Sequence, residues 1–504
     1  MAGTITLTGY SDSDKVPGAY AEVIFGTGAI NLRSLTMILL ICGLKSSSGT
    51  ITPDVDVVDL PTVDVCNTQY GQGSEGARMG RAALREIATG YRLMGCSATG
   101  TGAAATCTVT FATTASSAGY WNHFVGGTKI ETLVASGDTA TVQGDSFVAA
   151  CNKLPDLPFT ASNASGTVTC TLKHAGIRGN QWIIYQDKTY KPGATTCTLT
   201  GGSAVTSTAN VNGIFFSGGS GVETMTTMLA ALMAGRYHRI APAQNDATSL
   251  AAWASQINTK AGPLEGRSEH VVVATNGTSG AAISLAQTTL NNARFQLCTS
   301  FENETHPSEI AAAMAAKRAS REQTTPNSGY DGYQFITVQP QRFPGQVPAR
   351  ATLQLQLEAG VTPICGNVVA TCIRAITTHC LNGTTPDFRT IDVSHSVVPD
   401  FMAELFKARW TSQFVVANPN VAPDPGTNDP PTPAGVATPA LWNAEMLSIM
   451  LDEQARGTIT QIAANPPVSE FNTAAGAIRS RAPIIPTPIQ HAIGIRVEQV
   501  NAAA

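Results

Sequence analysis

Strict alternation of apolar and polar residues predicts strands at both ends and in the middle of the chain. It occurs in residues 4–8 (TITLT), in residues 493–498 (IGIRVE) and repeatedly between residues 97 and 208. A period of two places apolar side chains on one face of a strand and polar side chains on the other. In the middle region the polar face is rich in threonine, as in residues 106–111, and one helix is expected at 139–152. We therefore predict a β-rich insertion domain over residues 97–208.

Helical periodicity dominates on either side of that region. Ser74 precedes apolar residues at helical spacing, and from about residue 210 helical segments alternate with short apolar strands such as residues 270–274 (HVVVA). The apolar run at residues 35–43 fits a buried strand. This succession predicts an α/β core, a sheet flanked by helices, formed by residues 26–96 and 209–480.

Shorter segments complete the pattern. A strand is expected near residues 62–66, a helix over 280–291 with Ser279 as its cap, and β structure over 351–357 and 368–377. Helices are expected over 399–414 and 440–456, on either side of a Pro-rich surface loop at 423–439.

The composition limits the class of protein. Of the 504 residues, 43% are apolar and only 13% are charged, and the formal net charge is -4. An average globular protein has about 25% charged residues. A protein without a basic excess is poorly suited to neutralise phosphates, so we predict no nucleic-acid partner. A surface so poor in charge is typical either of an assembly subunit whose surface is covered by other protein or of a β surface coated with Thr, Ser and Gly.

Apolar runs and cysteines indicate the compartment. The longest apolar run, residues 35–44, is about half the length that a bilayer span needs, so no membrane insertion is predicted. No secretory signal is recognised at the start of the chain. The eleven cysteines form no CxxC pair and lie mostly in apolar or alternating runs, which predicts a chain that folds in a reducing cytoplasm without disulfides.

One motif resembles a dinucleotide-binding turn. Gly71-x-Gly73-x-x-Gly76 lies between an expected strand and an expected helix. Dinucleotide chemistry also needs an acid for the ribose about 20 residues later. Glu86 is too close, and residues 91–107 contain no acid. The motif is therefore interpreted as a Gly-rich turn, and no cofactor is predicted.

Other candidate chemistry is equally weak. Residues 277–281 (GTSGA) resemble a serine-protease loop around Ser279, but neither His270 nor His306 has the sequence context of a catalytic base. Cys365, Cys372 and the His379-Cys380 pair lack the spacing of metal ligands. We predict no catalytic residue, no metal and no enzyme activity.

The terminal strands are more informative. A lone strand can neither satisfy its backbone groups nor bury its apolar face. Residues 4–8 and 493–498 have no turn-linked partner nearby. Each must therefore join a sheet, either in its own subunit or in a neighbouring copy by strand addition. For one terminus alone the intramolecular choice is favoured, whereas two such termini on a charge-poor chain favour exchange between copies.

Four groups of residues resemble motifs of the tail sheath proteins of contractile-tailed phages, in particular the Mu-like group. Residues 16–23 (VPGAYAEV) are similar to the family's PGvYvE segment, and Tyr70–Ser74 followed by Ala77-Arg78-Met79 is similar to its FGxGS–xxxxM turn. Gly137-Asp138-Thr139, Leu157-Pro158 and Gly176-x-Arg178-Gly179-Asn180 resemble markers of its insertion domain. Residues 374–378 (RAITT), Pro386-Asp387 and residues 391–393 (IDV) resemble its RAITT…PD…LDV signature.

The resemblance implies a structural polymer. Family subunits form stacked hexameric rings around an inner tube and contract to drive that tube through the host cell envelope. The implied partners are other copies of the chain, the tail tube protein, and the baseplate and tail terminator proteins. The implied location is the virion tail, after assembly in the host bacterial cytoplasm.

The resemblance also implies a role for each part of the chain. Residues 1–25 would be an N-terminal extended arm and residues 481–504 a C-terminal arm, whose strands complete the core sheets of neighbouring subunits, while residues 97–208 face outward. The implied intersubunit strand contacts are Ile5, Leu7, Tyr20, Val23, Ile493, Ile495 and Val497. Possible inner-tube contacts are Glu445, Asp452 and Glu453 on helix 440–456, although helix 399–414 competes for that role.

Two other functions remain open at this stage. The Thr/Gly-rich middle region is also compatible with a surface-exposed or capsid-decorating β-rich structural protein. A nucleotide-binding α/β enzyme that uses the Gly71 turn is the less favoured alternative.

Overall fold

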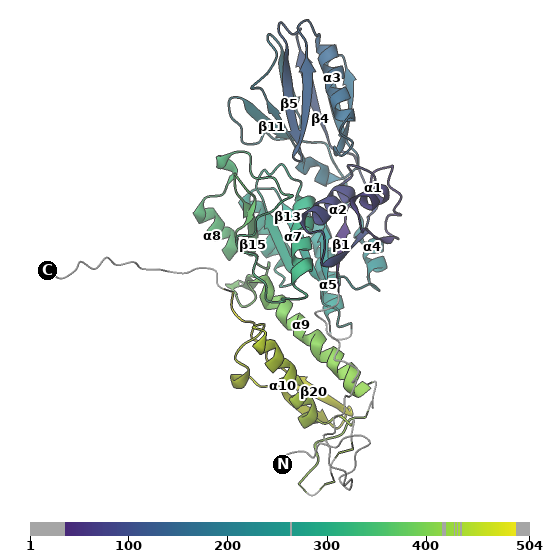
Figure 1. Cartoon of the computed structure of the whole chain (residues 1–504), viewed down its shortest axis with the longest axis vertical. Helices are drawn as coiled ribbons and strands as arrows, with labels where there is room; N and C mark the ends of the chain where they lie inside the picture. The colour runs from purple at the N-terminus through teal and green to yellow at the C-terminus, as the bar shows by residue number, and fades with distance from the viewer. Residues whose placement is uncertain are drawn as a thin grey trace, which may run out of the picture. The chain divides into compact units, whose positions relative to one another are not determined.

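A computed structural model describes residues 36–262, 265–415, 420–427, 429–430, 432–433 and 436–489 (Figure 1). The chain forms two compact units. The larger unit contains residues 36–401 and 457–460 and continues from residue 485, and the smaller unit contains residues 402–456 and 461–484. Each unit is described by itself below.

An eight-stranded mixed sheet forms the centre of the larger unit. Its strands lie in the order β16-β15-β14-β13-β12-β1-β3-β2. Six strands are parallel, and the two edge strands, β2 and β16, run antiparallel to their neighbours. The strands are β1 (Met37–Cys42), β2 (Val57–Asp59), β3 (Tyr91–Cys96), β12 (Arg239–Pro242), β13 (His270–Thr275), β14 (Phe295–Thr299), β15 (Val361–Cys365) and β16 (Thr371–Cys372). The predicted mixed α/β architecture is confirmed.

Helices cover both faces of this sheet, which explains why its central strands read as continuous apolar runs. One face packs against α1 (Val63–Tyr70), α2 (Glu75–Glu86) and α7 (Pro307–Arg321). The other face packs against α4 (Met225–Leu232), α5 (Ala247–Ala261) and α6 (Ser279–Ser284), with α8 (Arg350–Glu358) beside β15. Helix α7 lies against the strands in Figure 1, and twelve of its fifteen residues are buried.

Capping residues explain why one prediction from the sequence pattern is confirmed and another is wrong. The Ser74 side chain caps α2 as expected, by accepting a hydrogen bond from the Ala77 N–H. The predicted strand at 62–66 is wrong, because Thr62 caps α1 in the same way. The predicted β structure at 351–357 is also wrong: this stretch lies in α8, whose alternating leucines imitate a strand.

The helix expected at 280–291 has a different N-cap residue and does not stay α-helical to its end. Thr278, not Ser279, is the N-cap, because its hydroxyl accepts from the Ala281 N–H. Helix α6 then continues as a π-helical turn over Leu285–Leu290, which ends at Asn291 in the left-handed region, with φ of 34°. Asn tolerates this conformation better than most residues.

Residues between β3 and α4 form two four-stranded antiparallel sheets, of order β10-β4-β8-β7 and β11-β9-β5-β6. Cys107, Val109 and Phe111 are buried on one face of β4 while its threonines are half-buried, as the alternation predicted. The expected helix is present as α3 (Ala140–Asn152), which is capped by Thr139 and packs on the first sheet and on β6. The strands are β4 (Thr106–Ala112), β5 (Gly119–Val125), β6 (Thr128–Val134), β7 (Phe159–Ala164), β8 (Thr167–Leu172), β9 (Ile183–Asp187), β10 (Thr196–Thr200) and β11 (Val211–Phe215).

The smaller unit contains two helices and a hairpin. Helix α9 (Val393–Trp410) begins in the larger unit and is followed by a π-helical turn at Thr411–Val415. Helix α10 (Pro439–Ala455) packs against the hairpin of β19 (Val468–Asn472) and β20 (Ala477–Arg481). Trp410 lies with its ring centroid 5.0 Å from those of Phe414 and Trp442, at the centre of this unit.

Short elements complete the described structure. The larger unit holds the two-residue strands β17 (Leu381–Asn382) and β18 (Thr385–Pro386) and the 3₁₀ turns Ile177–Gln181 and Pro344–Gln346. The smaller unit holds the 3₁₀ turn Ile462–Ala464.

The burial of a helix side chain predicts how much its truncation lowers the free energy of unfolding. Ile257 on α5 is fully buried, so Ile257→Ala should lower the free energy of unfolding by about 2–5 kcal/mol. Leu355→Ala, on an α8 side chain that is 58% exposed, is the matched control and should change that free energy by less than about 0.5 kcal/mol. Urea unfolding followed by circular dichroism measures both changes. Equal effects of the two variants would contradict the assigned core.

Candidate functional site

The chain's own atoms fill the Gly71–Gly76 turn. The Gly76 N–H donates to the Leu44 carbonyl over 3.0 Å, and a Cβ on Gly76 would lie 2.1 Å from the Tyr70 ring. A Cβ on Gly73 would lie 2.3 Å from the Leu157 carbonyl oxygen. The glycines therefore allow close packing around the start of α2, and the turn has no space in which a pyrophosphate could approach the backbone.

A buried charge cluster joins α2 to the two antiparallel sheets. The Arg178 guanidinium donates two hydrogen bonds of 2.9 Å to Glu75 and one of 2.7 Å to Glu223. All three side chains are almost fully buried. Burial alone would raise the pKa of Glu75, but the charge and hydrogen bonds of Arg178 outweigh burial and hold this pKa well below its usual range. Arg178 therefore fixes residues 97–217 to the start of α2.

A second arginine joins three parts of the larger unit. Arg78 on α2 donates to the Glu309 carboxylate over 2.8 and 3.3 Å and to the carbonyls of Asp156 and Gly126 over 2.9 and 3.2 Å. Its guanidinium also lies 4.9 Å from the centroid of the Trp182 ring. Arg78 thus links α2, α7 and the antiparallel sheets.

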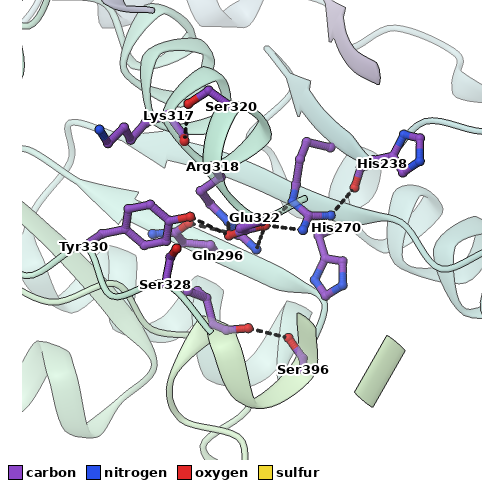
Figure 2. Close-up of polar contacts among 12 residues, drawn as sticks. His238, His270, Gln296, Lys317, Arg318, Ser320, Glu322, Ser328, Tyr330 and Ser396 are labelled. Carbon is purple, nitrogen blue, oxygen red and sulfur yellow. Dashed lines mark hydrogen bonds and ion pairs between the residues drawn. The ribbon is translucent and has the colours of Figure 1, made fainter. Parts of the chain in front are cut away.

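A third cluster lies where α7 ends, and Figure 2 shows how its side chains converge on Glu322. Arg318 donates to Glu322 over 2.6 Å, and Arg239 from β12 forms an ion pair with the same carboxylate. The Tyr330 hydroxyl donates to it over 3.1 Å, while Arg318 also reaches Gln296 on β14 over 3.0 Å. Burial favours protonation of Glu322, but the two arginines outweigh burial and lower its pKa to about 2. The cluster is therefore ionised and attaches α7 to the sheet.

Asp400 attaches the first part of α9 to the sheet. It accepts hydrogen bonds from Arg294 over 3.0 and 2.7 Å, and His270 Nε2 lies 3.1 Å away. Burial, together with the positive charge of Arg239, lowers the pKa of His270 to about 4, so its imidazole is neutral at pH 7 and donates to Asp400. The ionic part of this contact therefore comes from Arg294.

The RAITT…PD…IDV motif fastens the segment that precedes α9. Arg374 donates to Asp392 over 3.0 and 3.1 Å, and the Thr377 N–H donates to the Ile391 carbonyl over 2.7 Å. The Ile376 N–H donates to the Thr362 hydroxyl on β15 over 3.0 Å. These motif residues pair with one another and with the sheet, so their role in the larger unit is structural.

The candidate catalytic side chains of Ser279, His270 and His306 each have a different partner. The Ser279 hydroxyl accepts from the Gln356 amide over 2.7 Å, whereas His270 contacts Asp400 and His306 caps α7. His306 also stacks on Trp182 with ring centroids 4.6 Å apart. Among the described residues no group of three or more His, Cys, Asp or Glu side chains is arranged to hold a metal ion. All eleven cysteines are described, and each is buried and free.

Within the described residues, the hairpin β19–β20 has two edges without a partner strand. Val468 pairs with Arg481 and Asn472 with Ala477, and the Ser469 and Ser480 hydroxyl oxygens lie 2.7 Å apart. Within the described part of the chain neither strand pairs with a third strand. Residues 468–481 (VSEFNTAAGAIRSR) show imperfect alternation around Gly476, which has φ of 56°. The sequence interpretation missed this hairpin, although that alternation and the turn glycine could have indicated it.

The predicted contact residues divide into two groups. Ile5, Leu7, Tyr20, Val23, Ile493, Ile495 and Val497 lie outside the described residues. The three acids expected to face an inner tube lie on α10 but differ in exposure. Glu445 is half-buried with Arg409 at 3.7 Å, Asp452 is exposed, and Glu453 is only 6% exposed with Arg456 at 3.8 Å. The structure therefore places Glu445 and Asp452, seven residues apart, on an accessible side of α10.

None of the helices in the described ranges is both long enough and apolar enough to cross a bilayer.

Comparisons with known proteins were made for the whole chain. It matches no protein-family model, and no curated protein is similar to it at a significant level. A crystal structure of a sheath tail protein from Desulfitobacterium hafniense is similar, with 13% sequence identity, coverage of 93% of this chain and 97% of that chain, and a TM-score of 0.48. A sheath tail protein from Listeria innocua is similar with 10% identity, coverage of 90% and 92%, and a TM-score of 0.48. The function proposed below depends on the sequence motifs and on the geometry described above.

Loss of Arg178 should be strongly destabilising. Arg178→Met leaves two buried carboxylates without their cation, so the free energy of unfolding should fall by about 3–5 kcal/mol at pH 7. In the variant, burial raises the pKa of Glu75 above its unfolded value of about 4.3. The penalty therefore applies above that value and is relieved as the pH falls toward it. Urea unfolding at about pH 7.5 and about pH 5 should show a smaller difference from the wild type at the lower pH.

Arg92→Met is the matched control. It breaks the exposed pair of Arg92 with Asp59 and should leave the unfolding midpoint almost unchanged. A difference between Arg178→Met and wild type that grows on acidification would contradict the assigned charge cluster.

Proposed function

We propose that this chain is a structural subunit of the contractile tail sheath of a phage, with sequence motifs of the Mu-like group. The observation that carries the proposal is the hairpin β19–β20, whose two outer edges have no partner strand in the described residues, in a chain whose two terminal segments alternate like strands. In this proposal the hairpin accepts arm strands from neighbouring copies, and the copies form stacked hexameric rings around an inner tube.

The hairpin has the properties of a strand acceptor. A two-stranded hairpin is marginally stable by itself, and a sheet of three or more strands is far more stable. Each outer edge presents backbone N–H and C=O groups that an added strand can satisfy, as in recognition by strand addition. The two edges match in number the two predicted arms, residues 1–25 and the part of residues 481–504 that follows β20. The added strands would contribute main-chain hydrogen bonds, while Ile5, Leu7, Tyr20 and Val23 on one arm and Ile493, Ile495 and Val497 on the other contribute apolar contacts.

The larger unit suits a part that moves as a rigid body. The clusters around Arg178, Arg78 and Glu322 connect its elements through buried charged pairs, and each pair would cost several kcal/mol to break. Subunits can then change their mutual orientation while the arms keep them linked. If each subunit favours the contracted arrangement by about 2–5 kcal/mol, the sum over many subunits drives contraction without nucleotide hydrolysis.

The proposal assigns the remaining surfaces as follows. The Thr-rich sheets between residues 97 and 208 face outward. Helix α10 faces the tail tube protein through Glu445 and Asp452, whereas the buried Glu453 supports the helix from within. The first and last rings contact baseplate and tail terminator proteins. The subunit assembles in the host bacterial cytoplasm and then belongs to the virion tail, and no nucleic acid, membrane or cofactor takes part.

Electron microscopy of the protein expressed alone tests the polymer. The full chain should form tubes, whereas deletion of residues 1–19 should leave a folded, soluble subunit that forms none, because one arm strand is lost. The double variant Ile5→Asp/Leu7→Asp should behave like the deletion. Thr6→Asp/Thr8→Asp changes the opposite face of the same strand and is the matched control that should retain tubes. Normal tubes from the truncated chain would contradict the arm assignment.

A peptide tests the hairpin as the acceptor. A synthetic peptide of residues 1–12 should compete with the arm for the open hairpin edge and lower the rate of tube formation, followed by light scattering. A peptide of the same composition with scrambled order has no alternation and should have no effect. Replacement of hairpin residues 468–481 by a short Gly/Ser linker should abolish both polymerisation and peptide binding. Persistence of peptide binding in that variant would show that the hairpin is not the acceptor.

A further inference from the structure

One face of α2 carries three arginines into a polar pocket of the larger unit. Arg78, Arg81 and Arg85 follow one another at helical spacing and line a pocket of about 380 Å³. The opposite walls come from residues 126–128, at the turn between β5 and β6, and from residues 336–339. The pocket therefore lies between α2 and one of the antiparallel sheets of the larger unit.

The charges around this pocket do not cancel. Three arginines face two carboxylates, because Arg78 pairs with Glu309 and Arg81 pairs with Asp156. Among the described residues the exposed Arg85 takes part in no ion pair or hydrogen bond, and the lining carries one excess positive charge. Burial and the neighbouring positive charges of Arg78 and Arg85 lower the pKa of Arg81, while the carboxylates of Glu309 and Asp156 act in the opposite direction.

We propose that this pocket binds a single oxyanion group, a carboxylate or a phosphate, through the guanidinium groups of Arg81 and Arg85. The planar guanidinium fork matches the oxygens of both groups. Thr128 and Gln339 line the facing wall and offer a hydroxyl and an amide for further hydrogen bonds. The buried Arg78–Glu309 pair forms the floor of the pocket, and the Arg78 guanidinium uses four of its five N–H groups on the Glu309 carboxylate and two carbonyls.

Two sources can supply this oxyanion. One is free inorganic phosphate, whose binding does not depend on the proposed function. The other is an acidic side chain of a second copy of the chain, and this source rests on the proposed function. In either case the pocket is partly open and holds one excess charge, so the affinity for a free anion should be in the millimolar range and should fall with ionic strength.

Titration of the full chain with inorganic phosphate tests the pocket. Isothermal titration calorimetry at constant ionic strength should show saturable binding that sodium chloride does not reproduce. Arg85→Gln should weaken binding by about five-fold or more and should leave the fold intact, since this exposed side chain has no partner among the described residues. Asp156→Asn removes a competing negative charge and should strengthen binding by about two- to five-fold.

Arg350→Gln is the matched control, because Arg350 is also exposed but lies at the start of α8, and it should leave binding unchanged. Phosphate binding that Arg85→Gln leaves intact would overturn the proposal. So would weaker binding in Asp156→Asn, or binding that equals the effect of chloride.

Polymerisation assays separate the two sources. If an acidic side chain of a second copy is the ligand, phosphate should slow tube formation by the wild type, and Arg85→Gln should raise the protein concentration that tube formation requires. If free phosphate is the ligand, tubes should form at the same rate with and without it. A chain that binds phosphate as described but never polymerises would support the pocket and contradict the sheath proposal, so the two failures are distinguishable.

Discussion

The burial of α7 is the constraint on which the larger unit depends. Twelve of its fifteen residues are buried, yet it begins beside Glu309 and ends beside Arg318 and Glu322. A buried ion that lacks a partner is very costly, so Glu309 at the start of the helix needs an opposite charge from elsewhere, whereas Arg318 and Glu322 pair with each other at its end. Arg78 from α2 supplies the charge for Glu309, and Arg239 from β12 also pairs with Glu322. The helix is thereby attached to both a neighbouring helix and the central sheet.

This arrangement explains how the antiparallel sheets are attached to the rest of the larger unit. Arg78 uses its remaining donors on the carbonyls of Gly126 and Asp156, and Arg178 reaches from the same region to Glu75 at the start of α2. Helix α2 therefore contributes the Arg78 guanidinium to Glu309 on α7 and the Glu75 carboxylate to Arg178. One buried ion pair and two hydrogen bonds from a buried guanidinium specify one orientation of the sheets on α2 better than apolar packing alone would.

Local patterns in the sequence predicted many of the helices and strands. They could not predict the ion pairs between residues that are far apart in the chain. The apolar run in β1, the Ser74 cap of α2 and the alternation in β4 each depend on neighbouring residues, so the sequence could indicate them. The strands predicted near Thr62 and at the leucines of α8 were wrong, because a capping residue and a short alternation are each compatible with both helix and strand. Arg78 and Glu309 are 231 residues apart, and no local pattern connects them. The open hairpin was missed because its alternation is imperfect and a Pro-rich segment follows it.

The burial of the cysteines has a practical consequence. All eleven lie inside the protein, and burial raises the pKa of the Cys66 and Cys298 thiols to about 12. Thiolate is the reactive form, so the native thiols should be inert toward maleimides at neutral pH while the protein is folded. A single cysteine introduced on the surface could then be labelled selectively with a fluorophore, in a chain with its full set of native cysteines. Distances between neighbouring copies could in this way be followed in real time by energy transfer.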